Sequence, residues 1–292
     1  MGATGHVGAV VANELLARGE KVTILTRHPD RARAWQGKGA AVEAVDVEDA
    51  SSLTRAFRFG RRAFLLNPPA DPSGDTDATE RRTIANILTA LEDSGLEKVV
   101  AASTYGAQPG DALGDLSTLW ELEEGLRAQP IPAAINRGAY YMTNWLGFAD
   151  AARSEGVLPS MFPSDFAIPM VAPTDLGKSA AERLLAPVDD IDLRCVEGPA
   201  RSTPEDVADA FASALGRAVT VDVAPRERWE AMYQSAGFSP EAARAYVRMT
   251  AVTLDSGFAP PASAERGATD LSSFVAATMA KDVQRAIYDF PD

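Results

Sequence analysis

Hydrophobic positions in the first 140 residues alternate between the spacing of a helix and that of a buried strand. Val7, Val10, Val11 and Leu15 recur at helical spacing, and this segment ends at Arg18-Gly19. Apolar runs typical of strands stand at 21–27, 42–46, 62–66, 98–103 and 131–136, and helical spacing returns at 49–59, 84–91 and 120–126. Strands that alternate with helices at this interval predict an α/β fold with a doubly wound parallel sheet.

Before the first helix stands Gly2-Ala3-Thr4-Gly5-His6-Val7-Gly8, which predicts a phosphate-binding turn. Three glycines at this spacing can provide a sharp turn, bare backbone against a phosphate, and close packing of the helix on the sheet. The N–H groups of residues 4–7 would then face a ligand from a helix N-terminus. Such a turn needs a strand before it, and only Met1 precedes it. We therefore expect a short apolar strand upstream of Met1 that this sequence lacks.

Residues able to contact a ligand follow each predicted strand, at the edge where parallel sheets bind their ligands. Arg27 ends the strand at 21–27, Arg31 follows within a turn, and no acid stands between Glu20 and Asp30. An arginine at this position favours the 2′-phosphate of NADP(H) over the free ribose of NAD(H), so NADP(H) is the predicted cofactor. His28 is expected on the loop surface. The other strand-end candidates are Asp46, Val47, Asn67, Pro68, Ser103 to Tyr105, and Arg137 to Tyr140.

The pattern changes after about residue 155, where prolines become frequent and the predicted elements become short. We predict helices at 174–185, 203–215, 226–236, 239–254 and 270–287, with strands at 193–197 and 219–223. This divides the chain into a dinucleotide-binding domain at 1–155 and a smaller, mixed but mainly helical substrate or partner region at 156–292. The two are expected to interweave, because the strand around Cys195 can return to the main sheet.

Composition narrows the classes of partner. The chain has 292 residues, of which 46% are hydrophobic, and a formal net charge of −13, so nucleic acid and anionic membranes are poor candidates. A single cysteine, Cys195, excludes an internal disulfide and fits a cytoplasmic location. No apolar run approaches the roughly 20 residues of a membrane span, and no signal segment is present. Two histidines and one cysteine predict no zinc site, and a hydrolase elbow of the Gly-x-Ser-x-Gly type is absent.

The order of the motifs resembles the NmrA-like branch of the atypical short-chain dehydrogenases/reductases. The resemblance rests on GATGHVG, TRHPDRA, VDVED, LLNPP, STYGA and NRGAYYMTNW, which together extend over nearly the whole chain. It implies a Rossmann-type sheet and binding of NAD(P)H. With the strand-end positions, it gives these candidate cofactor-binding residues: Gly2, Thr4, Gly5, His6, Val7, Gly8, Arg27, Asp46, Val47, Asn67, Pro68, Ser103, Arg137, Gly138 and Tyr140.

The catalytic pair of most short-chain dehydrogenases is absent. These enzymes use Tyr-x-x-x-Lys, in which the lysine lowers the pKa of the tyrosine, but no tyrosine here has a lysine four residues later. Many NmrA-like proteins keep a lysine early in the helix after the strand at 98–103, and Leu119 stands at the matching position. Tyr105 is the candidate for orienting or protonating an acceptor, with packing as its alternative role; Tyr140 and Tyr141 either wall the pocket or belong to the core.

Two functions follow from these observations. The first is an NADP(H)-dependent oxidoreductase that passes hydride to a quinone or another small conjugated acceptor. This reaction needs little acid–base catalysis by the protein. The second is a non-catalytic NADP(H) sensor that acts through a protein partner, which the apolar Leu119 favours. The family to which the resemblance points contains both kinds of protein.

Overall fold

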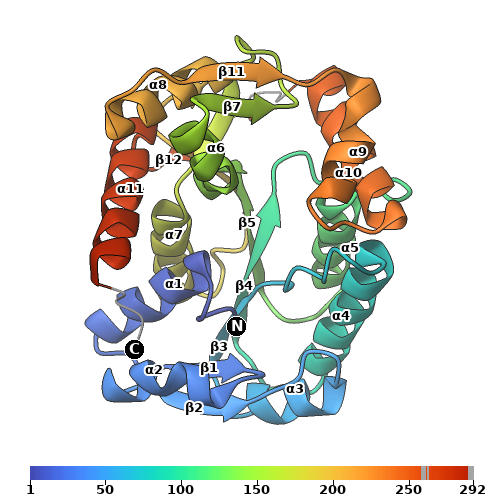
Figure 1. Ribbon diagram of the computed structural model, residues 1–292. Coiled ribbons are helices and arrows are strands. Elements are labelled where there is room, and N and C mark those ends of the chain that lie inside the picture. Colours follow the sequence, from blue (N-terminus) through green and yellow to red (C-terminus); the bar gives the residue numbers. More distant parts are fainter. Residues whose placement is uncertain (258–260, 262, 289–292) are drawn as a thin grey trace.

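The computed structural model describes residues 1–257, 261 and 263–288, and its centre is a parallel sheet (Figure 1). The strands of this sheet are β3 (Arg62–Leu65), β4 (Lys98–Thr104), β5 (Ala133–Gly138), β9 (Leu193–Glu197) and β12 (Ala264–Arg266), in the order β12-β9-β5-β4-β3. Each neighbouring pair is parallel. The predicted α/β fold is thus confirmed, and β9 returns to the main sheet beside β5 as expected for the strand around Cys195.

Helices cover both faces of the sheet, as a doubly wound fold requires. One face carries α1 (His6–Ala17) and α7 (Pro173–Leu185), whose Val7 and Leu176 share a buried cluster with Phe64. The other face carries α3 (Ala50–Phe57), α4 (Thr76–Leu91) and α5 (Asp115–Arg127), which bury Leu53, Ile87 and Leu122. Alternate residues of each strand point to opposite faces, so the strands read as nearly continuous apolar runs.

A second group of elements crosses the carboxyl end of the sheet (Figure 1). It includes the parallel pair β7 (Val157–Ser160) and β11 (Thr220–Val223), and a small sheet of β6 (Tyr140–Tyr141), β8 (Ile168–Val171) and β10 (Arg201–Ser202). Helices α6 (Ala149–Ser154), α8 (Pro204–Leu215), α9 (Trp229–Ser235), α10 (Pro240–Ser256) and α11 (Leu271–Tyr288) surround these strands, with short 3₁₀ turns η2 (Met142–Phe148) and η3 (Arg226–Arg228). None of the helices, over the residues that the structure describes, is long and apolar enough to cross a bilayer.

The N-terminal strands stand apart from the main sheet. β1 (Thr23–Thr26) and β2 (Ala41–Ala44) form a separate parallel pair, joined by η1 (Pro29–Ala32) and α2 (Arg33–Gly37). Within the described residues no strand precedes α1, and the Met1 amino nitrogen donates a hydrogen bond of 2.9 Å to the Phe64 carbonyl of β3. The sheet is therefore interrupted between β1 and β3.

Two cationic side chains, the half-buried Arg62 and the buried Lys98, tie the C-terminal end of α7 to the sheet. Arg62 donates to the carbonyls of Leu184 and Ala186 at 2.5 and 2.8 Å, and the fully buried Lys98 donates to those of Arg183 and Pro187 at 2.8 and 2.9 Å. The last carbonyls of a helix have no partners within the helix and carry partial negative charge, so cations stabilise this end. These contacts fix α7 against β3 and β4.

Candidate cofactor and active site

The glycine turn leads directly into α1. Gly2 has a φ of +72°, which L side chains rarely adopt, and the Gly5 N–H donates a hydrogen bond of 2.9 Å to the Gly2 carbonyl. A Cβ added at Gly8 would lie 2.3 Å from the Gly2 carbonyl oxygen, a separation that no side chain tolerates. The turn is therefore closed by backbone-to-backbone packing that only glycine permits at Gly8.

The tip of this turn is open to a ligand. Thr4, Gly5 and His6 are exposed, whereas Ala3, Val7 and Gly8 are buried. Gly5 is the N-cap of α1, no side chain caps this end, and the first turn of the helix contains no acidic residue. Free N–H donors and the helix dipole both favour an anion at such a position. The geometry suits the phosphate role expected for these residues.

A cavity of about 460 Å³ lies beside the turn, and its walls include basic side chains. It is lined by Ala3, Thr4, Thr26, His28, Arg31 and Trp35. His28 is exposed on the loop, as expected, and it lines this cavity together with Arg31. Arg27 is exposed on the same loop but is not one of the lining residues. The basic wall next to the phosphate turn therefore comes from Arg31 and His28.

The candidates after β2 and β3 lie on neighbouring loops. Asp46 is exposed and accepts a hydrogen bond of 3.0 Å from the Glu48 N–H. Val47 is buried in the core, with its carbonyl accepting from the Asn86 side chain. Asn67 accepts a hydrogen bond of 2.6 Å from the Thr83 hydroxyl. This bond holds the Asn67 amide in one orientation beside half-buried Pro68.

Ser103 and Arg137 converge on one carboxylate. The Ser103 hydroxyl donates to Oε1 of Glu123 at 2.5 Å, and Arg137 donates to both oxygens of Glu123 at 2.7 Å each. Glu123, on α5, is only 1% exposed. A buried carboxylate needs such partners because its desolvation is costly. The Arg137 guanidinium is thus engaged with α5, and the sequence pattern gave no sign of this partner.

The Tyr105 side chain points into the protein. It follows β4, is buried, and its hydroxyl donates a hydrogen bond of 3.0 Å to Oε1 of Glu197 on β9. Glu197 also accepts a hydrogen bond of 2.7 Å from Arg266 of β12. Burial is the main reason why the pKa of Tyr105 lies far above its ordinary value, with Cys195 and Glu197 adding to the shift. In this arrangement the phenol acts as a donor to Glu197.

Gly138, Tyr140 and Tyr141 form the turn after β5. A Cβ at Gly138 would lie 3.0 Å from atoms of Leu176 and Tyr141, so the turn packs tightly on α7. The Tyr140 ring lies 5.9 Å from that of Trp145 and 5.8 Å from that of Phe162, and burial raises its pKa. Tyr140 therefore packs on the core of the C-terminal region.

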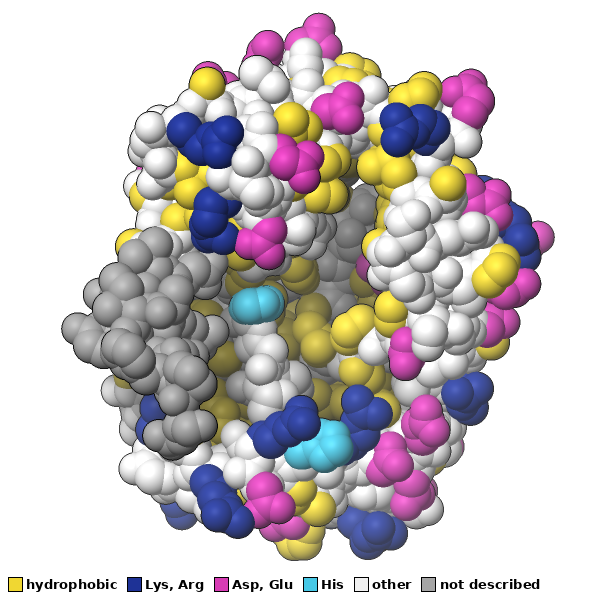
Figure 2. All heavy atoms as spheres, viewed as in Figure 1, with side chains coloured by type: hydrophobic (Ala, Val, Ile, Leu, Met, Phe, Trp, Pro, Cys, Tyr) yellow, Lys and Arg dark blue, Asp and Glu magenta, His cyan; other side chains and the backbone are white. Residues whose placement is uncertain are grey.

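The surface is hollowed at the carboxyl end of the sheet. Figure 2 shows this hollow between the part that carries α1 and α7 and the part that carries α9 and α10, with hydrophobic side chains along it and basic side chains gathered below. Burial raises the pKa of Tyr141 to about 12, with a smaller contribution from the charge of Asp115.

Helix α4 carries a buried carboxyl group, that of Glu80, which the sequence did not predict. Glu80 is 3% exposed and accepts hydrogen bonds of 3.3 Å from the Ala70 N–H and 3.1 Å from the Thr118 hydroxyl. Burial raises its pKa to about 7, and the nearby Asp115 carboxylate adds to the shift. Leu119, one residue after Thr118, packs half-buried against the core and supplies no charge.

Comparison with known proteins identifies the N-terminal part of the chain. Residues 2–129 match the family model described as NAD(P)H-binding. This stretch is therefore similar to NAD(P)H-binding proteins. The nitrogen metabolite regulation-like protein bik4 of Gibberella fujikuroi is 26% identical over 204 residues, which cover 64% of this chain and 60% of that protein. The NmrA-like resemblance predicted from the motifs is therefore confirmed.

Other relatives are reductases by name. The (4-alkanoyl-5-oxo-2,5-dihydrofuran-3-yl)methyl phosphate reductase of Streptomyces griseus is 28% identical over 218 residues, covering 74% of this chain and 73% of that enzyme. The crystal structure of the NADPH-dependent quinone oxidoreductase QOR2 of Escherichia coli with NADPH superposes with a TM-score of 0.81 at 21% identity, covering 95% of this chain and 98% of that one. The second likeness confirms the Rossmann-type fold.

Proposed function

We propose that this protein is an oxidoreductase that uses NADPH to reduce a small conjugated acceptor such as a quinone. The observation that carries the proposal is the cavity between the glycine turn and the Arg31–His28 wall. Thr4 of the phosphate turn and two basic side chains border one space of about 460 Å³, which suits an adenosine ribose bearing a 2′-phosphate. This arrangement favours NADP(H) over NAD(H).

We also assign cofactor contacts to most of the remaining candidate residues. The backbone of Gly2 to Gly8 would hold the pyrophosphate at the start of α1, and Asp46 and Val47 would border the adenine. Asn67, Pro68, Ser103 and Gly138 would border the nicotinamide, from the carboxyl ends of β3, β4 and β5. The cofactor supplies a hydride when bound. The protein's part is to bind and orient both partners and to exclude water.

An acceptor that needs little acid–base catalysis suits these residues. The chain lacks a Tyr-x-x-x-Lys pair, and the half-buried Leu119 cannot lower the pKa of a phenol. A quinone or conjugated carbonyl becomes an oxyanion or enolate that solvent can protonate. The Streptomyces relative is named for a conjugated oxo-dihydrofuran, and the Escherichia coli protein for a quinone, which supports this substrate class. Tyr105, whose buried hydroxyl already donates to Glu197, takes the packing role that was its alternative.

A second function, an NADP(H) sensor that acts through a protein partner, is supported by the apolar Leu119 and by the regulatory name of the Gibberella relative. For either function we propose a cytoplasmic location, which the single free Cys195 supports.

Titration with NADPH and NADH, followed by a panel of quinones and conjugated lactones, separates the two functions. The oxidoreductase requires NADPH binding and acceptor-dependent NADPH oxidation. NADPH binding without oxidation by any acceptor would favour the sensor, and binding of neither NADPH nor NADP⁺ would contradict both functions.

A further inference from the structure

The loop after β3 carries two of the residues assigned above to the nicotinamide, Asn67 and Pro68, and side chains of α4 hold this loop. The Thr83 hydroxyl donates a hydrogen bond of 2.6 Å to Oδ1 of Asn67. The Ala70 N–H donates one of 3.3 Å to Oε1 of Glu80. Glu80 and Thr83 stand one turn apart on α4, and each is 3% exposed. Both contacts therefore come from one buried face of α4.

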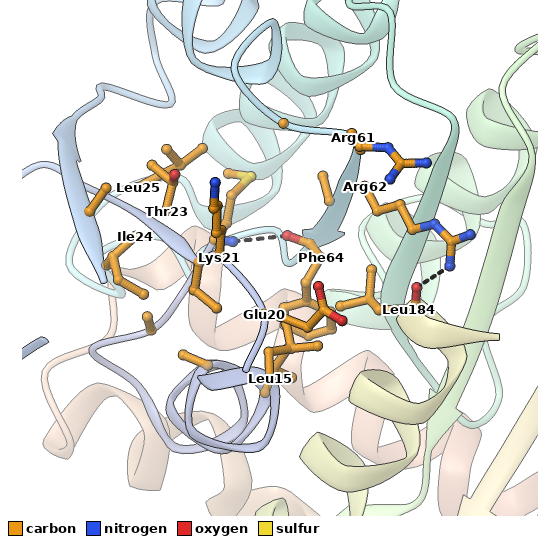
Figure 3. Close-up of a pocket in the computed structure, with 18 of the residues that line it drawn as sticks. Leu15, Glu20, Lys21, Thr23, Ile24, Leu25, Arg61, Arg62, Phe64 and Leu184 are labelled. Atoms are coloured by element: carbon orange, nitrogen blue, oxygen red, sulfur yellow. Dashed lines mark hydrogen bonds between the residues drawn. The ribbon is translucent and has the colours of Figure 1, made fainter. Parts of the chain in front are cut away.

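The strand before this loop is fixed by contacts of its own. At the start of β3, Arg62 donates to the Leu184 carbonyl of α7 (Figure 3), and the whole strand pairs with β4. Beyond β3 the chain leaves the sheet, and the prolines at 68 and 69 have no N–H with which to hold the loop. The Ala70 N–H is the first donor after these prolines, and it is bound to Glu80. The position of the loop thus depends on α4.

The Glu80 carboxyl group also joins the loop to α5. Its Oε2 accepts a hydrogen bond of 3.1 Å from the Thr118 hydroxyl, and the carboxyl group hydrogen-bonds that of Asp115. Burial of a carboxyl group between two helices is costly even with these partners, as the rise of its pKa to about 7 shows. Apolar side chains such as Ile87 and Leu122 pack the same two helices together without this cost. Helix packing alone therefore does not account for a carboxyl group at this position, whereas its contact with the loop does.

We propose that Glu80 and Thr83 are positioning residues for the cofactor, which hold the loop after β3 so that Asn67 and Pro68 meet the nicotinamide end of NADPH. This inference rests on the proposed function, which assigns these two residues to the nicotinamide. Glu80 and Thr83 act through the loop and not by touching the cofactor. The phosphate turn and the cavity beside it are built from other segments of the chain, so binding of the adenosine end does not depend on this loop.

Two ligands distinguish the two ends of the site. Adenosine 2′,5′-bisphosphate has the adenosine and the 2′-phosphate of NADPH but no nicotinamide, and calorimetric titration gives the Kd of each ligand. We expect Glu80→Ala to raise the Kd for NADPH by about tenfold and that for the bisphosphate by less than about twofold, because only the loop loses a hydrogen bond. Thr83→Val, a change that keeps the size of the side chain, should show the same selective loss. Glu80→Gln keeps an oxygen for the Ala70 N–H and should bind NADPH within about twofold of the wild type.

Ile87→Val is the matched control, because it removes one buried carbon atom one turn further along α4 and leaves both contacts with the loop in place. It should lower the melting temperature and change neither Kd. Equal losses for the two ligands in Glu80→Ala and Thr83→Val, or an unchanged Kd for NADPH in both, would overturn the proposal. Thr83→Val removes only a hydroxyl group, so it decides the question even where Glu80→Ala does not fold.

The measurements report binding, so failure of the proposed reductase function is seen separately. Wild-type protein that binds NADPH and reduces no acceptor would contradict the reductase function, while the selective loss in the two variants would still support positioning by α4. Wild-type protein that does not bind NADPH would overturn both proposals.

Discussion

The Tyr105 hydroxyl donates a hydrogen bond of 3.0 Å to the buried carboxylate of Glu197. A phenol whose pKa is raised by burial is a weak acid, and this one already has an acceptor for its proton. We therefore expect Tyr105→Phe to change kcat for acceptor reduction by less than about threefold. We also expect it to lower the free energy of unfolding by about 1–3 kcal/mol, because Glu197 loses a donor. Steady-state kinetics and urea unfolding measure the two effects. A loss of kcat of about 100-fold at unchanged stability would instead make Tyr105 the proton donor.

Variants of Arg31 and Arg27 distinguish the two arginines that could bind the 2′-phosphate of NADP(H). Both side chains are exposed, but Arg31 lines the cavity beside the phosphate turn and Arg27 does not. We expect Arg31→Ala to raise the Kd for NADPH by about 10- to 100-fold, since a charge-assisted hydrogen bond to phosphate is lost, and to leave the Kd for NADH nearly unchanged. Arg27→Ala is the matched variant and should have the smaller effect. A larger loss in Arg27→Ala, or equal losses for NADPH and NADH, would contradict this assignment.

Gly8 tests the packing of the phosphate turn. A Cβ at Gly8 would lie 2.3 Å from the Gly2 carbonyl oxygen, so Gly8→Ala must displace the turn. We expect it to lower stability by about 2 kcal/mol or more and to abolish measurable NADPH binding. Gly37→Ala is the control, because a Cβ there has no neighbour within 4 Å, and it should change stability by less than about 1 kcal/mol. Thermal unfolding and fluorescence titration measure both. Normal NADPH affinity in Gly8→Ala would show that the turn is not the phosphate site.

The raised pKa of Glu80 predicts that the stability of the protein depends on pH. Its pKa is raised from 4.5 to about 7 by burial, so the folded protein holds a proton that the unfolded chain has released between these values. The contribution of Glu80 to stability therefore falls as pH rises from about 4.5 to about 7. Between pH 4 and pH 8 we expect the wild type to lose about 3 kcal/mol more than Glu80→Gln, which cannot ionise.

Urea unfolding at both pH values measures this difference. Glu43→Gln, which removes an exposed carboxyl group, should follow the wild type. Parallel stability curves for the wild type and Glu80→Gln would mean that Glu80 is already ionised at neutral pH in the folded protein.

Most of the order of elements followed from periodicity, because long helices and strands buried on both faces have distinct patterns. The strands β6, β7, β8, β10 and β12 were not predicted individually, since two to four residues show too few alternations to define a period. The pairing of β9 with β5 was expected only as a possibility, because pairing between distant strands is set by packing and not by local sequence.

The edge of the sheet at which the candidate residues lie was predicted, but their contacts with other side chains were not. Ser103 and Arg137 lie near the carboxyl ends of β4 and β5, because neighbouring parallel strands end at the same edge. Their shared partner Glu123 stands on a helix, in a sequence that reads as an ordinary charged helix surface. Glu197 as partner of Tyr105 lies 92 residues away along the chain, which no local pattern reports. His28 is exposed on its loop as predicted, but the cavity that it borders was not predicted, because the later Trp35 forms part of its wall.

The central claim, hydride transfer from NADPH to a small conjugated acceptor, is tested most directly with NADPH that carries deuterium at nicotinamide C4. The labelled cofactor is mixed with the protein and a panel of conjugated lactones and quinones, and the reduced products are analysed by mass spectrometry. Quinones report through the rate of NADPH oxidation, because hydride delivered to oxygen exchanges with water, and lactones report through deuterium fixed on carbon. We predict NADPH oxidation that depends on both protein and acceptor, with deuterium in the reduced lactone. Tight NADPH binding with no oxidation by any acceptor would contradict the claim.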